Sequence, residues 1–445
     1  MLNMTQGLYT FIHDLKFSDL PEPVIGFARR WLLDLLGVAA SGSRTDMSRI
    51  MRDHVAAQFG AGGRSAQMLF DGRAVSAAGA ALAGGVSIDA LDAHDGHRLV
   101  KGHVGCGVFP AALALSEAED RLDGAEFLTA LVLGYEIGTR AGIALHRSAS
   151  DYHTSGAWVA LATAALGARA LALDSDATRE ALGIAEYHGP RSPMMRVIDH
   201  PTMVKDGSGW GAMAGVSAAY LAASGFTGAP ALTVERDDLA DLWSDLGEKW
   251  RIFEQYFKPY PICRWAQPPV QAILQLRREH NLQADQVERI EVHTFHQAVR
   301  LAIRRPETTE QAQYSTAFPC ATALVRGVVG ADEVAPQAFN DPAILRLADS
   351  MLFTESDDFN AAFPARRFAQ VTLQLKDGRR LASAPTEARG DPEDPASMAE
   401  VRAKFHALAT PVLGVERASA IEQAVDGLGE QGSVAELIRL AASAV

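Results

Sequence analysis

Apolar residues recur at three- and four-residue spacing along most of the first 260 positions. Phe127, Ala130 and Leu131 are one example. Because this spacing places the apolar side chains on one face, it predicts α-helices. Alanine and glycine on these faces favour close packing of the helices. Glycine and polar turns separate the predicted helices, which span residues 24–42, 77–85, 110–122, 124–145, 157–173 and 211–224.

The pattern changes after Trp265. Apolar and polar residues then alternate from 287 to 295 and again from 368 to 375, which is typical of strands with one buried face. An Asp-Gly pair at 377–378 predicts a hairpin turn into a return strand that starts at Leu381. Further helices are predicted at 268–280 and 309–330.

The segment 388–395 holds Gly390, two prolines and several acidic residues, which is typical of a linker. The chain is again rich in alanine and leucine from Ser397 onward. These patterns predict a mostly α protein, with a large all-helical domain and an inserted smaller α+β domain. We expect the helical domain to comprise residues 1–266 and 396–445, and the lid-like α+β domain to comprise residues 267–395.

Charge and composition exclude several classes of partner. The chain carries 41 basic and 54 acidic residues, a formal net charge of −13, and no run of Lys and Arg exceeds two. Nucleic acid is therefore not an expected partner.

Three distant cysteines argue against a disulfide framework and fit a reducing compartment. The first twenty residues lack a signal-peptide core, and glycine, polar residues and a proline interrupt the longest uncharged stretch, 207–234. We expect a cytoplasmic protein without a membrane partner.

The densest group of chemically active side chains follows the predicted helix at 77–85. Two carboxylates, three imidazoles and a lysine occupy twelve positions, namely Asp92, His94, Asp95, His97, Lys101 and His103. Imidazoles beside carboxylates are typical of general acid–base catalysis. The same residue types also ligate metals, with His94 and His97 joined by Asp92 or Asp95. A polar loop that caps helix ends remains the third interpretation.

Three further segments place polar residues beside helices or at the expected domain boundary. His153 precedes the helix at 157, and Lys205 precedes a glycine-rich helix start, where the backbone favours anions. Lys258 and Arg264 lie in a proline-rich segment that would present them with little loss of entropy. Each segment also has a purely structural interpretation. His153 could cap a helix, the glycines after Lys205 could allow close helix packing, and the Lys258–Arg264 segment could be a hinge with solvated charges.

Taken together, these segments resemble the MmgE/PrpD family, which includes 2-methylcitrate dehydratase, cis-aconitate decarboxylase and iminodisuccinate epimerase. The resemblance covers nearly the whole chain. His94, Gly96, Val104 and Gln267 depart from the family pattern, Gln267 standing where a histidine is expected. The matching elements are Asp92, Asp95, His97 and His103, the His153–Gly156 element, the segment from Lys205 to Gly228, the segment from Lys258 to Arg264, and Gln311–Ser315.

The resemblance implies a homodimeric enzyme without metal or cofactor that acts beside a carboxylate of a small di- or tricarboxylic acid. Cations would stabilise the enediolate that develops there, while an acid or base moves the proton. We expect His103, oriented by Asp92, to be the first candidate for proton transfer and His153 the second. The expected carboxylate clamp is Lys205, Lys258 and Arg264, and the expected substrate contacts are Lys101, Arg264, His97, Tyr152 and Tyr314.

The departures leave the reaction open among dehydration, decarboxylation and epimerisation, because Gln267 cannot shuttle a proton. Two other classes remain as alternatives: a metal-dependent hydrolase using His94, His97 and His103, and a non-catalytic binder of organic acids. The acidic net charge does not exclude an anionic substrate if Lys101, Lys205, Lys258 and Arg264 converge, because a pocket can be locally positive.

Overall fold

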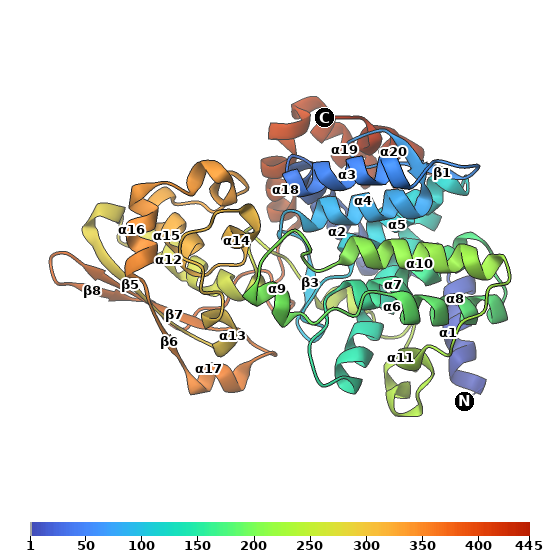
Figure 1. The fold of residues 1–445 in the computed structure, drawn as a ribbon, viewed down its shortest axis with the longest axis horizontal. Helices are drawn as coiled ribbons and strands as arrows, with labels where there is room; N and C mark the ends of the chain where they lie inside the picture. The colour runs from blue at the N-terminus through green and yellow to red at the C-terminus, as the bar shows by residue number, and fades with distance from the viewer. Residues whose placement is uncertain (1) are drawn as a thin grey trace.

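Alanine-rich helices form the larger part of the molecule, and a four-stranded sheet with its own helices forms the smaller part (Figure 1). The computed structural model describes residues 2–445. It is 58% helical and 9% strand, which confirms the predicted mostly α fold class. The helices of the first part are α1 Leu2–Asp14, α2 Glu22–Gly42, α3 Asp46–Gln58, α4 Ala77–Asp89, α5 Gly105–Ala118, α6 Gly124–Ser148, α7 Gly156–Ala170, α8 Ser175–His188, α9 Met195–Asp199, α10 Ser208–Ala223 and α11 Leu232–Glu235.

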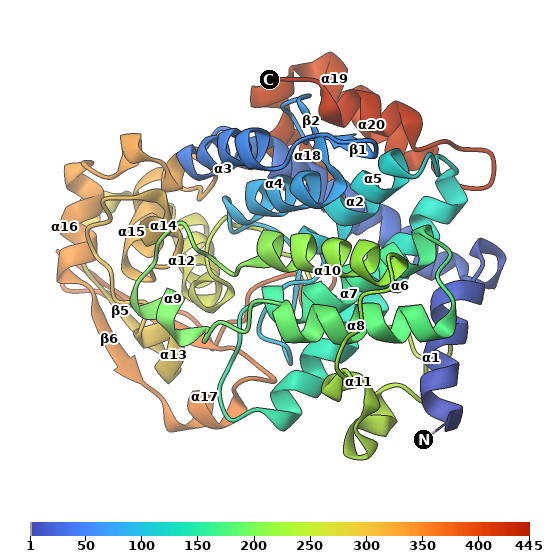
Figure 2. The same cartoon turned by 45° about the vertical axis from the view of Figure 1, so that its right-hand side comes forward.

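The larger part is built by close approach of small-residue helices, and Figure 2 shows α3, α4, α10 and α8 in succession across it. A Cβ atom at Gly211 would lie 2.3 Å from the carbonyl oxygen of Gly156, and one at Gly215 would lie 2.2 Å from that of Ala160. Helices α7 and α10 therefore pack at a separation that only glycine allows at these positions. Two short antiparallel pairs complete this part, β1 Ser65–Gln67 with β2 Ala74–Ser76 and β3 Gly96–His97 with β4 Gln255–Tyr256.

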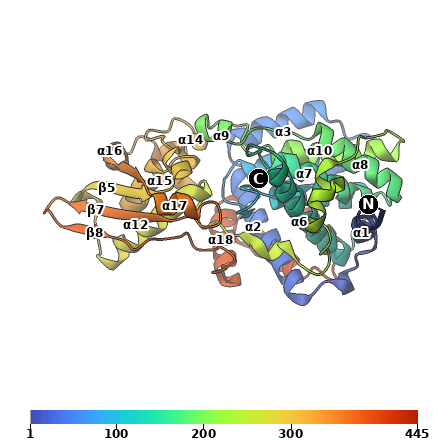
Figure 3. The same cartoon turned by 90° about the horizontal axis from the view of Figure 1, so that it is seen from below.

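The smaller part contains one sheet with the strand order β6-β5-β7-β8 (Figure 3). Strand β5 pairs in parallel with β6 and antiparallel with β7, and β7 pairs antiparallel with β8. Helices α12 and α16 pack against β7 and β5 respectively. The elements are α12 Gln267–Glu279, β5 Val287–Thr294, α13 His296–Val299, α14 Thr309–Gln313, α15 Ala317–Arg326, α16 Pro342–Ser350, β6 Leu352–Glu355, α17 Asp357–Ala362, β7 Ala369–Leu375 and β8 Arg380–Ala382.

The chain then returns to the larger part, where the C-terminal helices lie beside α2 and α3 (Figure 1). These helices are α18 Met398–Leu413, α19 Val415–Asp426 and α20 Ala435–Ala442. Helix α18 packs on α2, where Phe405 lies against Gly37 and Lys404 pairs with the buried Asp34 over 2.7 Å. The exact domain boundaries given above remain a prediction.

Most predicted elements are confirmed, including both long strands and the hairpin turn at Gly378, whose φ is 88°. Two predictions were wrong in detail. Helix α5 starts at Gly105, because Pro110 is accommodated inside it and packs on Gly84. The helix expected at 309–330 is split, since the Ser315 hydroxyl accepts the Phe318 amide and donates to the Ile303 carbonyl. The break lies beside Gln313 and Tyr314.

Helix α6 is the one helix within residues 2–445 that is long and apolar enough to cross a membrane. Its most apolar window is 94% buried inside the fold, as expected of a core helix.

Candidate active site

The loop between α4 and α5 carries most of the polar residues singled out above, and the fold buries them. Asp92, His94, His97 and His103 are each at most 6% exposed. Side chains at the start of α7 hold the backbone of this loop: the Ser155 hydroxyl accepts the His103 amide, and the Trp158 indole donates to the His103 carbonyl. This segment is therefore an ordered part of the interior.

The tautomer of His103 follows from its contacts. Its Nδ1 atom lies 2.5 Å from the carbonyl oxygen of Asp95. Since a carbonyl only accepts, Nδ1 carries the hydrogen and Nε2 keeps a free lone pair. Burial and the nearby His94 lower the pKa of His103 to about 4, so the ring is neutral at pH 7. Its Nε2 atom is thus available as a proton acceptor.

A carboxylate not singled out from the sequence is the closer partner of that nitrogen. Oδ2 of Asp206 lies 3.3 Å from His103 Nε2, whereas Oδ1 of Asp92 is 3.9 Å away. The expectation that Asp92 orients His103 is therefore corrected: the Asp95 carbonyl orients the ring and Asp206 faces its free nitrogen. Burial raises the pKa of Asp206 to about 6, within reach of proton transfer at neutral pH.

Asp92 is instead the partner of a lysine. The fully buried Lys258 donates to Asp92 Oδ1 over 2.5 Å. Burial works against the charged form of Asp92, but Lys258 and Lys205 outweigh it and hold the pKa of this carboxyl well below its usual range. The result is an ionised carboxylate and a cation side by side in the interior.

Lys205 joins the same cluster from the segment before α10, with a left-handed backbone, φ 44°. Its Nζ donates to Oε1 of Gln313 over 2.6 Å and lies 4.7 Å from the ring centre of Tyr314. The same Gln313 oxygen accepts the Asp92 amide, and its Nε2 donates to the Ala90 carbonyl. One side chain of α14 thus holds Lys205 and the loop between α4 and α5 together.

The structure therefore brings together five residues expected from the sequence, Asp92, His103, Lys205, Lys258 and Tyr314. Sequence reasoning missed Asp206 and Gln313. Both lie within segments that resemble the family, Asp206 in 205–228 and Gln313 in 311–315. Asp206 directly follows Lys205, and an acidic residue next to a candidate lysine could have been recognised from the sequence. The long-range contacts of Gln313 have no counterpart in local sequence.

Two expected substrate ligands are occupied elsewhere. His97 Nε2 is paired with Glu254 over 2.9 Å, at the short β3–β4 ladder. Arg264 donates to three backbone carbonyls, pairs with Asp391 and lies on the Tyr256 ring. Because these groups of the protein occupy its guanidinium, Arg264 links the two parts of the molecule and is not free to bind a substrate carboxylate.

Gln267 has a related role. Its Nε2 donates to the carbonyls of Tyr260 and Ile262, and its Oε1 accepts from Arg264. The side chain is fully buried and fastens the proline-rich segment that carries Lys258. At the position where the family pattern has a titratable histidine, this chain therefore has a glutamine with a structural role.

The remaining candidates form a second group beside the first. Lys101 lies 4.2 Å from the ring centre of Tyr152, and burial together with Arg367 lowers the Lys101 pKa to about 8. His153 stacks on His146 with 6.4 Å between ring centres. The His146 ring also lies edge-on to Trp158, with 5.3 Å between ring centres, and Trp158 is the residue that donates to the His103 carbonyl. The roles of Lys101, Tyr152 and His153 as site residues stay predictions.

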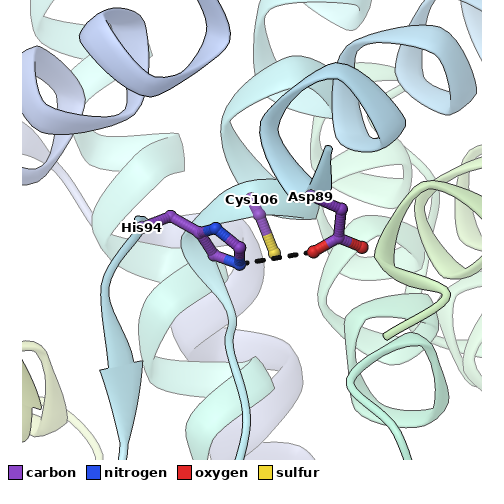
Figure 4. Close-up of side chains that lie close together, drawn as sticks. All are labelled: Asp89, His94 and Cys106. Atoms are coloured by element: carbon purple, nitrogen blue, oxygen red, sulfur yellow. Dashed lines mark ion pairs between the residues drawn. The ribbon is translucent and has the colours of Figure 1, made fainter. Parts of the chain in front are cut away.

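Metal-ligand spacing occurs twice within residues 2–445, and both groups contain His94. One comprises Asp89, His94 and Cys106 (Figure 4), and the other Asp92, His94 and His103. His97 belongs to neither, so the triad of His94, His97 and His103 expected for a metal-dependent hydrolase is not assembled.

Comparison with known proteins adds a family context. Residues 6–249 match the model of the MmgE/PrpD N-terminal domain, and residues 260–430 match that of the MmgE/PrpD C-terminal domain. The chain is 25% identical to the cis-aconitate decarboxylase-like protein oryM of Aspergillus oryzae, over 98% of this chain and 97% of that protein. It is 24% identical to cis-aconitate decarboxylase of Homo sapiens (96% and 92% covered) and 23% identical to that of Mus musculus (98% and 93% covered).

Proposed function

We propose that this chain, which belongs to the MmgE/PrpD family, is a lyase that breaks a bond beside a carboxylate of a small di- or tricarboxylic acid. The observation that carries the proposal is the buried cluster itself. It combines two lysines with a neutral histidine whose free nitrogen faces a carboxyl of raised pKa. Its relatives named as cis-aconitate decarboxylases make decarboxylation of a cis-aconitate-like acid the first reaction to test.

The lysines supply the binding and the electrostatic stabilisation. An ammonium group has three donors, and Lys205 gives one of them to Gln313. The others can receive a substrate carboxylate. As the bond beside that carboxylate breaks, its electron pair moves onto the carboxylate-bearing carbon and is delocalised into an enediolate. Fixed cations in a dry site stabilise this charge far better than water does.

His103 and Asp206 then complete the reaction by proton transfer. We propose that they share one proton between Nε2 and Oδ2, which lie 3.3 Å apart. In a decarboxylation, the carbon–carbon bond breaks, carbon dioxide leaves, and the carbon takes up this proton. Solvent later restores it. A positioned acid or base of this kind contributes about 10²–10⁴-fold to the rate.

The site is assembled from both parts of the chain, which has a consequence for substrate entry. Lys258 is fully buried, and Gln313 reaches the cluster from α14 of the smaller part. We propose that the smaller part acts as a lid, which opens to admit the acid and closes to exclude water.

We further propose a homodimer in which α10 faces its copy. Large apolar side chains on this helix and beside it are 41–68% exposed: Met203, Val204, Trp210, Leu221 and Phe226. Trp210 and Leu221 lie on α10, and the other three residues lie in the segments that flank it. Exposed apolar patches are typical of protein interfaces. Light scattering should give twice the chain mass of 47.6 kDa, and Trp210→Glu should give the single mass. A monomeric wild type contradicts this part of the proposal.

The function is tested by incubating the purified protein with a panel of di- and tricarboxylates that includes cis-aconitate and 2-methylcitrate. Proton NMR identifies any product. Loss of carbon dioxide or water from one acid supports the lyase, whereas inversion without loss would assign epimerisation instead. No change in any acid, with tight binding of one, would favour a binding protein.

A further inference from the structure

Three side chains that the proposed reaction does not use lie close together, as Figure 4 shows. One of them, His94, has its ring centre 4.1 Å from that of His103. Asp89 is the last residue of α4, His94 lies in the following loop, and Cys106 is in the first turn of α5. Their ligand atoms all lie within 4.8 Å of one another, and all three residues are buried. The three residues thus come from three successive segments of the fold.

His94 is the residue of the three whose side chain lacks hydrogen-bond partners. Its side chain is 1% exposed, and neither ring nitrogen has a hydrogen-bond partner among residues 2–445. Nε2 approaches Asp89 Oδ1 to 3.3 Å but without hydrogen-bond geometry. Buried polar atoms are nearly always paired, so two free nitrogens on one interior imidazole call for an additional group.

The separation between two of the ligand atoms fits a metal ion as that group. Zinc binds imidazole nitrogen and carboxylate oxygen at about 2.0–2.2 Å, which in a tetrahedral site separates two such ligands by about 3.4 Å. The 3.3 Å between His94 Nε2 and Asp89 Oδ1 matches this separation. A thiol, an imidazole and a carboxylate together select zinc or cobalt over magnesium or calcium. The second oxygen of Asp89 accepts the Ser208 amide, which orients the carboxylate as the neighbours of metal ligands do.

We propose that Asp89, His94 and Cys106 form a buried binding site for one thiophilic divalent cation such as Zn²⁺. Cys106 would lose its thiol proton to solvent and bind the ion as a thiolate. The ion would tie the ends of α4 and α5 to the loop between them, the loop that carries Asp92 and His103. Its role is to fix that loop, and it takes no part in the proposed lyase reaction.

The alternative group of Asp92, His94 and His103 is a poorer site. Asp92 Oδ1 is already held by Lys258. Binding there would break the ion pair of Lys258 with Asp92 and leave a buried ammonium unpaired. Asp89 and Cys106 have no such commitments to a cation.

Cobalt is the direct probe, because a cobalt–thiolate bond gives an intense charge-transfer band. Full-length protein freed of metal with a chelator is titrated with Co²⁺. We expect one ion per chain, the charge-transfer band, and the visible bands of a tetrahedral ion. Cys106→Ser should lose the charge-transfer band, while Cys320→Ser, whose thiol is buried in α15, should keep it. A wild type that takes up no cobalt, or a band that persists in Cys106→Ser, overturns the proposal.

Asp89→Asn, nearly identical in shape, gives a second measure that does not depend on the thiol. We expect its Co²⁺ affinity to fall by at least about 100-fold, more than the loss of a group that merely orients a ligand. Zn²⁺ should raise the melting temperature of the wild type but not of Asp89→Asn. Equal shifts in both proteins would contradict the site. Turnover of the metal-free protein is measured separately, so failure of the metal site and failure of the lyase function are distinguishable.

Discussion

Oε1 of Gln313 lies 2.6 Å from Nζ of Lys205 and 2.9 Å from the amide of Asp92, so one glutamine in the smaller part holds two elements of the larger part. The side chain is fully buried. The geometry of the cluster therefore depends on the contact between the two parts of the chain. This dependence explains why a substitution in α14 should change chemistry carried by other segments.

Replacing Gln313 with Leu should impair both stability and activity. The buried ammonium of Lys205 loses its acceptor, and a hydrogen bond to a charged group is worth about 1.5–3 kcal/mol. We expect a lower melting temperature together with a lower kcat/KM. Gln275→Leu, at an exposed position of α12, is the matched control and should change neither. Unaltered kcat/KM in Gln313→Leu would argue against this contact as an organiser of the site.

Lys205→Met should remove a cation from the substrate clamp while keeping most of the side-chain volume. Because the cation stabilises charge that grows in the transition state, we expect kcat to fall at least about 100-fold, the scale seen when one such group is lost. Steady-state kinetics separate kcat from KM. Lys376→Met, in the exposed hairpin, serves as the control. A change confined to KM would show that Lys205 only binds the acid.

Asp92→Asn should be strongly destabilising, because it leaves the buried ammonium of Lys258 without its counterion. Breaking a buried pair by removing one partner costs about 3–5 kcal/mol. Asp241→Asn removes a partner of Arg147 from a pair whose side chains are 62% and 48% exposed, and should cost less than about 1 kcal/mol. Urea unfolding compares the two, and equal losses of stability would contradict the assignment of Asp92 and Lys258 as a buried pair.

The pH dependence of kcat/KM should be bell-shaped if His103 and Asp206 share one proton in the active form. The pKa of His103 is lowered to about 4 and that of Asp206 is raised to about 6, both chiefly by burial. Below pH 4 the pair gains a second proton, and above pH 6 it loses the shared one, so activity falls on both sides. Asp206→Asn should abolish the alkaline limb. If kcat/KM of this variant still falls above about pH 6, the alkaline limb belongs to another group.

Local pattern was enough to predict much of the fold. The helical spacing around Phe127 and the alternation in β5 are properties of short segments, and α6 and β5 are where they were expected. The split between α14 and α15 was missed because it depends on Ser315, whose hydroxyl reaches a carbonyl twelve residues away. In the candidate site, Lys205 and His103 could be named from their motifs, but the residues that they pair with in space could not. Asp206 faces His103 across 103 positions of sequence, and Gln313 reaches Asp92 across 221, so only the fold shows these pairs.

Exchange with deuterated water tests the central claim most directly. In the proposed reaction, His103 passes a solvent-derived proton to the carbon beside a carboxylate. The acid that the wild type converts is incubated in deuterated water with wild type, His103→Gln and His153→Gln. We predict one deuterium at that carbon in the wild-type product, a kcat lowered by about 10²–10⁴-fold in His103→Gln, and a smaller effect in His153→Gln. Full turnover and labelling by His103→Gln would contradict the account.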